Sequence, residues 1–297
     1  MAETTLQDLV AQASGGKIVP YLGPGALQGS VNLATGEPIP AGSDSLILAM
    51  NGGKAMAPRL MYEFPRAAMY VEQKRGRNAL HRFLDATYGC THWSRSPLHD
   101  WIAAIKPPYV IDINRDSQLQ QSYAETPHTL IRGISRIGGT HFRFRIHTFD
   151  GESYSEKTAD QQAIDPSLPI LFKPMGSPLP DATYIASDAD YVDYISELMG
   201  GFAIPGFLKT LRRGKRYLFA GLRLTRDTER MVLSDIVYAA GEPAGWALIP
   251  EPNAKERRFC KKQNIELIEA DVSDLLTAAG AAGRTEKATH PIHDVGC

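Results

Sequence analysis

Two polar side chains, Asn114 and Asp116, stand at the end of an apolar run, residues 109–114, that has the composition of a buried strand. In open α/β sheets, ligands bind at the carboxyl ends of the strands. At such a position Asn114 can orient a water or a ligand, or its side-chain oxygen can cap the following helix. Asp116 can face the same ligand, or it can be a first-turn carboxylate that the helix dipole favours.

A second group of residues offers bare backbone instead of side chains. The apolar run 17–22 ends in Gly23, Pro24, Gly25 and Ala26. Glycines without a Cβ let a ligand approach the backbone, and the first N–H groups of a following helix can hold an anion such as a pyrophosphate. The alternative is an ordinary tight turn.

Apolar runs and helical patterns alternate along the rest of the chain. Further strands are predicted at residues 169–174, 216–221, 246–249 and 265–269, with helices at 5–13, 58–88, 97–105, 187–198, 204–211, 225–239, 255–262 and 272–282. This order predicts an α/β fold, a doubly wound (Rossmann-like) parallel sheet with helices on both faces. Residues 141–147 alternate between polar and apolar and predict an antiparallel strand in a small inserted segment.

No linker or repeat divides the chain, which predicts a single domain over residues 1–282. Insertions are expected at about 28–95 and 117–166, and the long loop 28–53 is a candidate lid or binding segment. Residues 283–297 are predicted to be a mobile tail. His290, His293 and Cys297 in that tail have metal-ligand spacing, but we favour a solvated tail and predict no metal site.

Composition excludes several kinds of partner. The 297 residues carry a formal net charge of −1, so nothing favours nucleic acid or an anionic membrane surface. No apolar run approaches the roughly 20 residues of a membrane-spanning helix, and the N-terminus lacks a signal pattern. Three widely separated cysteines fit a reducing compartment, so a cytoplasmic location is expected.

Four strand-end turns carry the strongest pattern. They are Gly23-Pro24-Gly25-Ala26, Ile113-Asn114-Arg115-Asp116, Met175-Gly176 and Gly221-Leu222-Arg223-Leu224. In this order they resemble the turns of sirtuin-like proteins, in particular the sirtuin-like domains of bacterial NAD-cleaving proteins. The resemblance extends over most of residues 5–282.

The resemblance implies that NAD or ADP-ribose binds at the strand ends. Its first turn is similar to the family's Gly-Ala-Gly, which holds the pyrophosphate. Asn114 falls at the catalytic asparagine and Asp116 at the aspartate on the nicotinamide side. The implied nucleotide-binding residues are Gly23, Pro24, Gly25, Ala26, Asn114, Asp116, Gly176, Gly221, Leu222, Arg223, Asn253 and Asp271.

Three positions depart from the family pattern. Leu27 stands where the family has a small polar residue after the first turn. Met175 occupies the position of the catalytic histidine, and a thioether cannot take up a proton near neutral pH. Three cysteines cannot form the four-cysteine zinc module of deacetylating sirtuins, so neither zinc nor protein deacetylation is expected.

Three functions follow, in order of preference. The first is binding of NAD or ADP-ribose, with catalysis reduced or lost at Met175. The alternative is an active NAD glycohydrolase in which Asn114 and Asp116 support slow hydrolysis without a histidine. His147, in the inserted segment, is a less favoured candidate to replace the missing base by swinging toward the site. The third is an interaction scaffold. The expected ligand is a nucleotide, and a homo-oligomer or a protein partner stays open.

Overall fold

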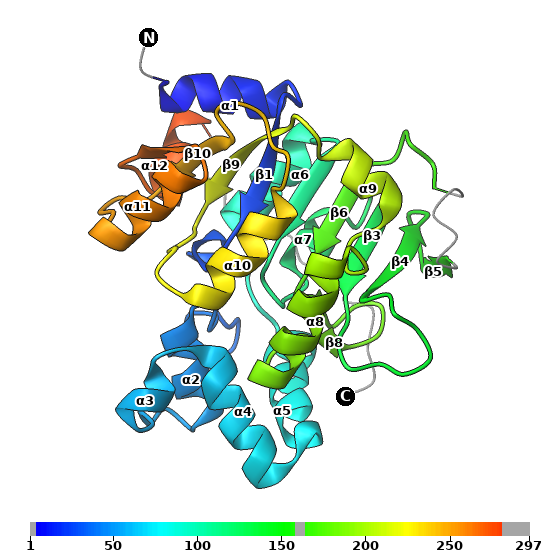
Figure 1. Ribbon diagram of the computed structural model, residues 1–297, viewed down its shortest axis with the longest axis vertical. Coiled ribbons are helices and arrows are strands. Elements are labelled where there is room, and N and C mark those ends of the chain that lie inside the picture. The colour runs from blue at the N-terminus through cyan, green and yellow to red at the C-terminus, as the bar shows by residue number, and fades with distance from the viewer. Residues whose placement is uncertain (1–3, 158–163, 281–297) are drawn as a thin grey trace.

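The computed structural model describes residues 4–157 and 164–280. Within these residues nine strands form one sheet in the order β11-β10-β9-β1-β2-β6-β3-β4-β5 (Figure 1). Pairing is parallel from β11 through β3, whereas β4 and β5 are antiparallel. The strands are β1 (Ile18–Leu22), β2 (Tyr109–Asp112), β3 (His128–Gly133), β4 (Phe144–Phe149), β5 (Tyr154–Lys157), β6 (Ile170–Lys173), β9 (Arg216–Ala220), β10 (Gly245–Leu248) and β11 (Ile265–Ile268).

Helices cover both faces of this sheet, because successive side chains of a buried strand point to opposite sides. In β1, Val19 and Tyr21 belong to one apolar cluster, and Ile18 and Leu22 belong to another. The first cluster is closed by α8 (Asp188–Gly200), α9 (Gly206–Leu211), α10 (Asp227–Ile236) and α11 (Ala254–Lys262), and the second by α1 (Leu6–Ser14), α6 (Pro97–Ile105), α7 (Gln118–Ser122) and α12 (Val272–Ala278). The predicted doubly wound, mostly parallel sheet is confirmed.

The segment 117–166 contains two strands that the sequence did not predict, β3 and β5, and β5 pairs antiparallel with β4. Its alternating part forms β4, antiparallel as expected, but the same segment also contributes β3 to the parallel part of the sheet. The apolar run in β3 is only Leu130 and Ile131, and the polar residues beside it, Thr129 and Arg132, are themselves buried. A run this short with polar ends gives little strand signal.

A group of short helices lies between β1 and β2. It comprises α2 (Ser43–Met50), α3 (Pro58–Met61), α4 (Phe64–Arg75), α5 (Arg77–Leu84) and a π-helical turn at Asp85–Cys90. These helices share their own apolar cluster, which includes Leu46, Phe64 and Leu84. In Figure 1 the group, in blue and cyan, lies beyond the carboxyl end of β1. We call it the helical cap.

The sheet has a switch point at β1. From β1 the chain crosses to β2 on one side, and after β6 it returns to β9 on the other side. At such a point the loops leave in opposite directions and open a crevice at the carboxyl ends of the strands. The helical cap stands over this crevice.

A two-stranded sheet of β7 (Gly176–Ser177) and β8 (Thr183–Tyr184) follows β6.

Among the described residues, no helix is both long enough and apolar enough to cross a membrane.

Candidate functional site

The turns after β1 and β9 pack directly against each other. The Gly25 N–H donates to the Gly221 carbonyl at 2.8 Å. A Cβ on Gly25 would lie 2.8 Å from the Gly221 Cα, and Gly221 itself has a φ of +72°. The glycines at both positions are therefore required by this contact between two turns.

This packing changes the role expected for the first turn. Pro24–Leu27 forms a short 3₁₀ helix, not the start of an α-helix. Pro24 has no N–H, the Gly25 N–H is bonded to Gly221, and the Ala26 N–H donates to the Gly23 carbonyl. The first N–H groups of this helix are therefore already bonded within the protein, and the cradle of free N–H groups expected for an anion is wrong in this form.

A cleft of about 640 Å³ opens beside the two turns. We call it the outer cleft. Its volume is within the range of small-molecule sites, roughly 300–1,000 Å³. It is lined by Pro24, Gly25, Gln28, Gly42, Ser43, Asp44, Ser45, Gly221, Leu222, Arg223, Thr225, Arg226, Glu229, Leu248, Pro250, Asp271 and Val272. Four members, from Gly42 to Ser45, come from the long loop 28–53 and the start of α2.

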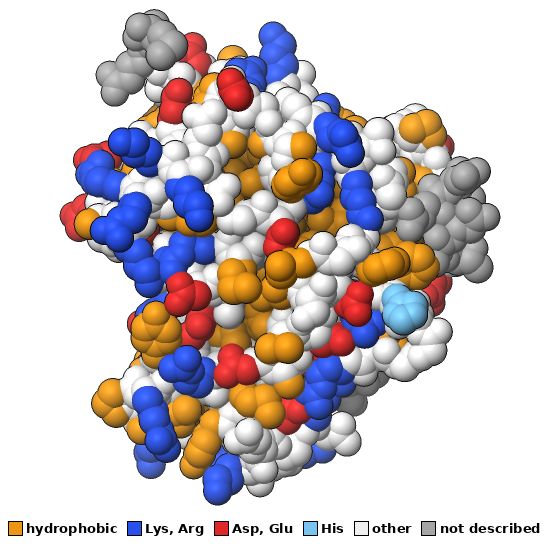
Figure 2. Space-filling model, in the orientation of Figure 1, with side chains coloured by type: hydrophobic (Ala, Val, Ile, Leu, Met, Phe, Trp, Pro, Cys, Tyr) orange, Lys and Arg blue, Asp and Glu red, His pale blue; other side chains and the backbone are white. Residues whose placement is uncertain are grey.

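Two arginines place positive charge in the outer cleft. Arg223 is half-exposed and pairs with the buried Glu256 at 3.0 Å. Arg226 lies 3.7 Å from Asp44 across the cleft. In Figure 2, Lys and Arg side chains also gather at the left of the molecule, over the region of α11 and the turn before α10. The lining also carries Asp44, Glu229 and Asp271, so Arg223 and Arg226 are the groups of this cleft that offer positive charge to an anionic ligand.

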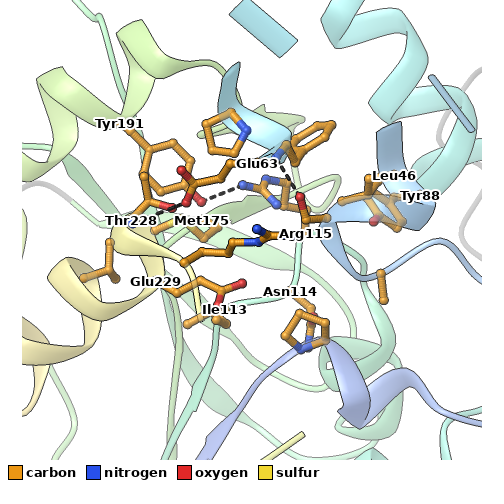
Figure 3. Close-up of a pocket in the computed structure, with 17 residues that line it drawn as sticks. Leu46, Glu63, Tyr88, Ile113, Asn114, Arg115, Met175, Tyr191, Thr228 and Glu229 are labelled. Carbon is orange, nitrogen blue, oxygen red and sulfur yellow. Dashed lines mark hydrogen bonds between the residues drawn. The ribbon is translucent and has the colours of Figure 1, made fainter. Parts of the chain in front are cut away.

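A smaller cavity of about 50 Å³, the inner pocket, adjoins the outer cleft (Figure 3). Pro24, Ser43, Arg226 and Glu229 line both. The other residues of the inner pocket are Ala41, Leu46, Glu63, Phe64, Pro65, Tyr88, Ile113, Asn114, Arg115, Met175, Tyr191, Thr228 and Val232. It therefore brings together the carboxyl end of β2, Met175 two residues after β6, the helical cap and α10.

Asn114 holds the ends of β1 and β2 together. Its Nδ2 donates to the Gly23 carbonyl at 2.9 Å and to Asp112 Oδ1 at 2.8 Å. The side chain is 4% exposed and does not cap α7, whose first residues follow Ser117. With Nδ2 doubly bonded, Oδ1 is the group through which Asn114 can act on a ligand in the inner pocket.

Asp112 anchors Asn114 from beneath. It is fully buried, and Lys173 Nζ on β6 donates to its Oδ2 at 2.7 Å. His99 Nε2 lies 3.3 Å from the same carboxylate oxygen, Asp112 Oδ2. Burial alone would raise the pKa of Asp112, but the Lys173 charge and the His99 hydrogen bond outweigh it and hold that pKa well below its usual range.

Asp116 lies behind this cluster and lines neither cavity. Its Oδ1 accepts the Gln118 N–H at 2.7 Å, and its buried Oδ2 has no hydrogen-bond partner within the described residues. Burial, together with the Asp112 carboxylate, raises the pKa of Asp116, although Lys173 opposes the shift.

Met175 faces the inner pocket at the end of β6 and is 3% exposed. The next residue, Gly176, has a φ of +81°, and a Cβ there would lie 2.1 Å from the Thr183 carbonyl. Gly176 therefore fits the tight β7–β8 pairing and lines neither cavity. The position expected for a histidine presents a thioether to the pocket.

Arg115 is a buried cation of the inner pocket. Its Nε donates to the Ile185 carbonyl at 2.7 Å, and a terminal nitrogen donates to the Tyr191 hydroxyl at 2.9 Å. The guanidinium also lies over the ring of Phe64. These contacts fix its position at the edge of the pocket.

Two glutamates face the same pocket. Glu63 Oε1 accepts from the Thr228 N–H and hydroxyl groups at the start of α10. Glu229 extends from α10 and lines both cavities. Burial, and next the Glu63 charge, raise the pKa of Glu229 to about 7, against the opposing effect of nearby arginines.

The structure therefore distributes the predicted site residues over three places. Pro24, Asn114 and Met175 line the inner pocket, and Pro24, Gly25, Gly221, Leu222, Arg223 and Asp271 line the outer cleft. Gly23, Ala26, Asp116, Gly176 and Asn253 line neither cavity.

Two residues near the ends of late strands are helix caps. Asn253 accepts from the Lys255 and Glu256 N–H groups at the start of α11. Asp271 similarly caps α12, and it also reaches the outer cleft. Capping thus accounts for Asn253 without a ligand.

His147 lies away from both cavities. It is buried on β4, beyond β6 and β3 from β2, and it contacts Arg132. Burial and the Arg132 charge lower the pKa of its imidazole to about 4. The tail residues His290, His293 and Cys297 lie outside the described residues.

The sequence also matches a known protein family. Residues 109–268 match the model of the SIR2-like domain, which is more than half of the chain. The chain belongs to this family. SIR2-like domains generally bind NAD, so the match supports an NAD-related function in general terms. No curated protein matches the sequence significantly.

The matched part of the SIR2-like domain contains the turns at Asn114, Gly176 and Gly221, and the β1 turn precedes it. Sequence reasoning missed Asp112 and Lys173, although each is a charge in an otherwise apolar strand, a pattern that signals a buried ion pair. It also missed Glu63 and Glu229. These glutamates occur in ordinary amphipathic helical sequence, which gives no sign of them.

Proposed function

We propose that this SIR2-like domain binds NAD or ADP-ribose across the outer cleft. The observation that carries the proposal is the cleft itself, about 640 Å³ at the switch point of a SIR2-like sheet. The adenosine part lies along Gly221, Leu222 and Asp271, and the pyrophosphate lies between Arg223 and Arg226. The cationic side chains supply the anion binding that the bonded backbone of Pro24–Leu27 does not.

The histidine-dependent chemistry of the family is lost in this proposal. Met175 faces the inner pocket, and its sulfur is only a weak hydrogen-bond acceptor. Asn114 keeps its place beside the pocket, so the domain retains ligand contacts while lacking the usual proton acceptor. The proposed hydrolytic route through Asn114 and Asp116 is weakened, because only Asn114 lines the pocket.

Calorimetry with ADP-ribose tests the proposal. Arg226→Ala removes a charge-assisted contact worth roughly 1.5–3 kcal/mol, so affinity falls by about tenfold to hundredfold. Arg257→Ala is the matched control. Arg257 pairs with Glu269 on the exposed side of α11, outside both cavities, and its variant keeps wild-type affinity.

No heat with ADP-ribose or NAD, at concentrations up to the millimolar range, would refute the proposed binding. Equal weakening by Arg226→Ala and Arg257→Ala would show that the ligand senses overall charge instead of the outer cleft.

A further inference from the structure

Glu229 stands at the junction of the outer cleft and the inner pocket. It lines both cavities from the first turn of α10, and Figure 3 shows it extending toward Ile113 and Asn114 at the end of β2. Its Oε2 is buried and has no hydrogen-bond partner within the described residues. Nor does the carboxylate form an ion pair in that part of the chain.

A carboxylate oxygen that is buried without a hydrogen-bond partner destabilises the fold, because its lost hydration is not replaced. At this position a glutamine or leucine would fit α10 without placing a charge in the cavity. Unpartnered acids of this kind concentrate at sites where the group acts on a ligand. Glu229 therefore has a poor structural explanation and a good functional one.

Charged and titratable groups surround Glu229 from every adjacent element. They are Glu63 before α4, Arg115 after β2, Arg226 and Arg230 around the start of α10, Tyr21 on β1 and Tyr191 on α8. Burial and Glu63 disfavour the carboxylate, while the arginines favour it. The balance leaves a group that exchanges its proton near neutral pH, as a general base must.

The two cavities differ in what they can hold. A cavity of about 150 Å³ holds benzene, whereas the inner pocket measures about 50 Å³. The inner pocket thus has room for water but not for a pyridine ring. A dinucleotide fits only the outer cleft, and Glu229 touches both spaces.

We propose that Glu229 is the general base of an NAD glycohydrolase and replaces the histidine missing at Met175. The inference rests on the proposed binding of NAD in the outer cleft. Glu229 takes a proton from a water in the inner pocket, and Asn114 Oδ1 helps to hold that water.

The reaction balances without a further reactant. The water oxygen forms a bond to C1′ of the nicotinamide ribose, and the C1′–nitrogen bond breaks. Its electron pair passes to the pyridinium nitrogen, so nicotinamide leaves uncharged. The water proton passes to Glu229 and then to solvent, and the products are ADP-ribose, nicotinamide and one proton. The carboxylate also faces the positive charge that develops on the ribose.

The test measures nicotinamide release and ADP-ribose binding on the same purified full chain. Glu229→Gln keeps the shape of the side chain but cannot accept the proton, so release falls by about 100-fold or more. Its affinity for ADP-ribose stays within about threefold of wild type. The matched control is Glu152→Gln in the exposed turn between β4 and β5, which leaves both quantities unchanged.

The pH profile separates a base from a merely structural residue. Release by the wild type rises with pH through about 7, as the Glu229 carboxyl loses its proton. Glu63→Gln removes a charge that raises this pKa, so the rise moves to lower pH while release persists. A profile that does not move would contradict the assignment.

The possible failures are distinct. The assignment of Glu229 as the base is overturned if the wild type binds ADP-ribose but releases no nicotinamide between pH 5 and 9. It is also overturned if Glu229→Gln releases nicotinamide as fast as the wild type. In both cases the proposed binding still stands. Absence of binding overturns the proposed function, and the base with it.

Discussion

The buried Asp112–Lys173 pair offers a measurable link between the core and the site. Both side chains are 0% exposed, and the ammonium lies 2.7 Å from the carboxylate. Lys173→Met keeps most of the apolar length and removes the charge, which leaves Asp112 without its cation. Breaking a buried pair in this way costs about 3–5 kcal/mol.

The lower end of that range applies here. Asp112 keeps the hydrogen bonds from the backbone N–H and Nδ2 of Asn114, and it keeps His99. We therefore expect Lys173→Met to lower the free energy of unfolding by about 3 kcal/mol at pH 7, measured by urea denaturation followed by circular dichroism.

The pH dependence has a definite sign. In the wild type the low pKa of Asp112 stabilises the fold above its unfolded value near 3.8, and this stabilisation is lost as the pH falls. In Lys173→Met the same carboxyl prefers its proton, so the difference between the two proteins narrows in acid. The double variant Asp112→Asn/Lys173→Met leaves no buried charge without its partner, so it recovers part of the lost free energy of unfolding.

The exposed pair Arg257–Glu269 is the control, and Arg257→Met should change stability by less than about 1 kcal/mol. A loss below about 1 kcal/mol in Lys173→Met would refute the reasoning. So would a double variant no more stable than the single one.

Three further predictions concern the turns and the inner pocket. Gly221→Ala places a Cβ 2.4 Å from the Ala26 nitrogen, at a φ of +72°. We therefore expect a lower melting temperature in thermal unfolding and weaker ADP-ribose binding in calorimetry. A variant with the wild-type melting temperature and affinity would contradict the contact between the turns. Met175→His returns a proton acceptor to the inner pocket, so we expect this variant to release nicotinamide faster than the wild type. An unchanged rate of nicotinamide release would show that other parts of the histidine-dependent site are absent. Because the pKa of Glu229 is raised, the native state binds the proton of this carboxyl more tightly than the unfolded chain does, and the free energy of unfolding of the wild type should fall as the pH rises from about 5 to 7. Glu229→Gln should reduce this dependence of stability on pH in urea titrations. An unchanged pH dependence would contradict the raised pKa.

The sheet could be predicted because its strands carry their own signals. Runs such as 17–22 and 216–221 are apolar and short, and each ends at a glycine, so both the strand and its end are visible in sequence. The strand β3 could not be found in this way. Its burial is imposed by β4 and β6 on either side, and it includes the polar residues His128 and Arg132.

The site was predictable only in part, because its residues owe their roles to contacts across the sheet. Gly25 and Gly221 were identified by type, but only the structure shows that they are needed against each other. Asn253 has the same type and place as a ligand contact, yet it caps α11. Glu63 and Glu229 are separated by most of the chain and meet only where the helical cap closes over α10.

The most direct test of the central claim is a crystal structure of the full chain with ADP-ribose. The account predicts ligand density in the outer cleft, with the adenosine beside Gly221 and Asp271 and the pyrophosphate at Arg223 and Arg226. Ligand density elsewhere on the chain, or an empty cleft at saturating ADP-ribose, would contradict it.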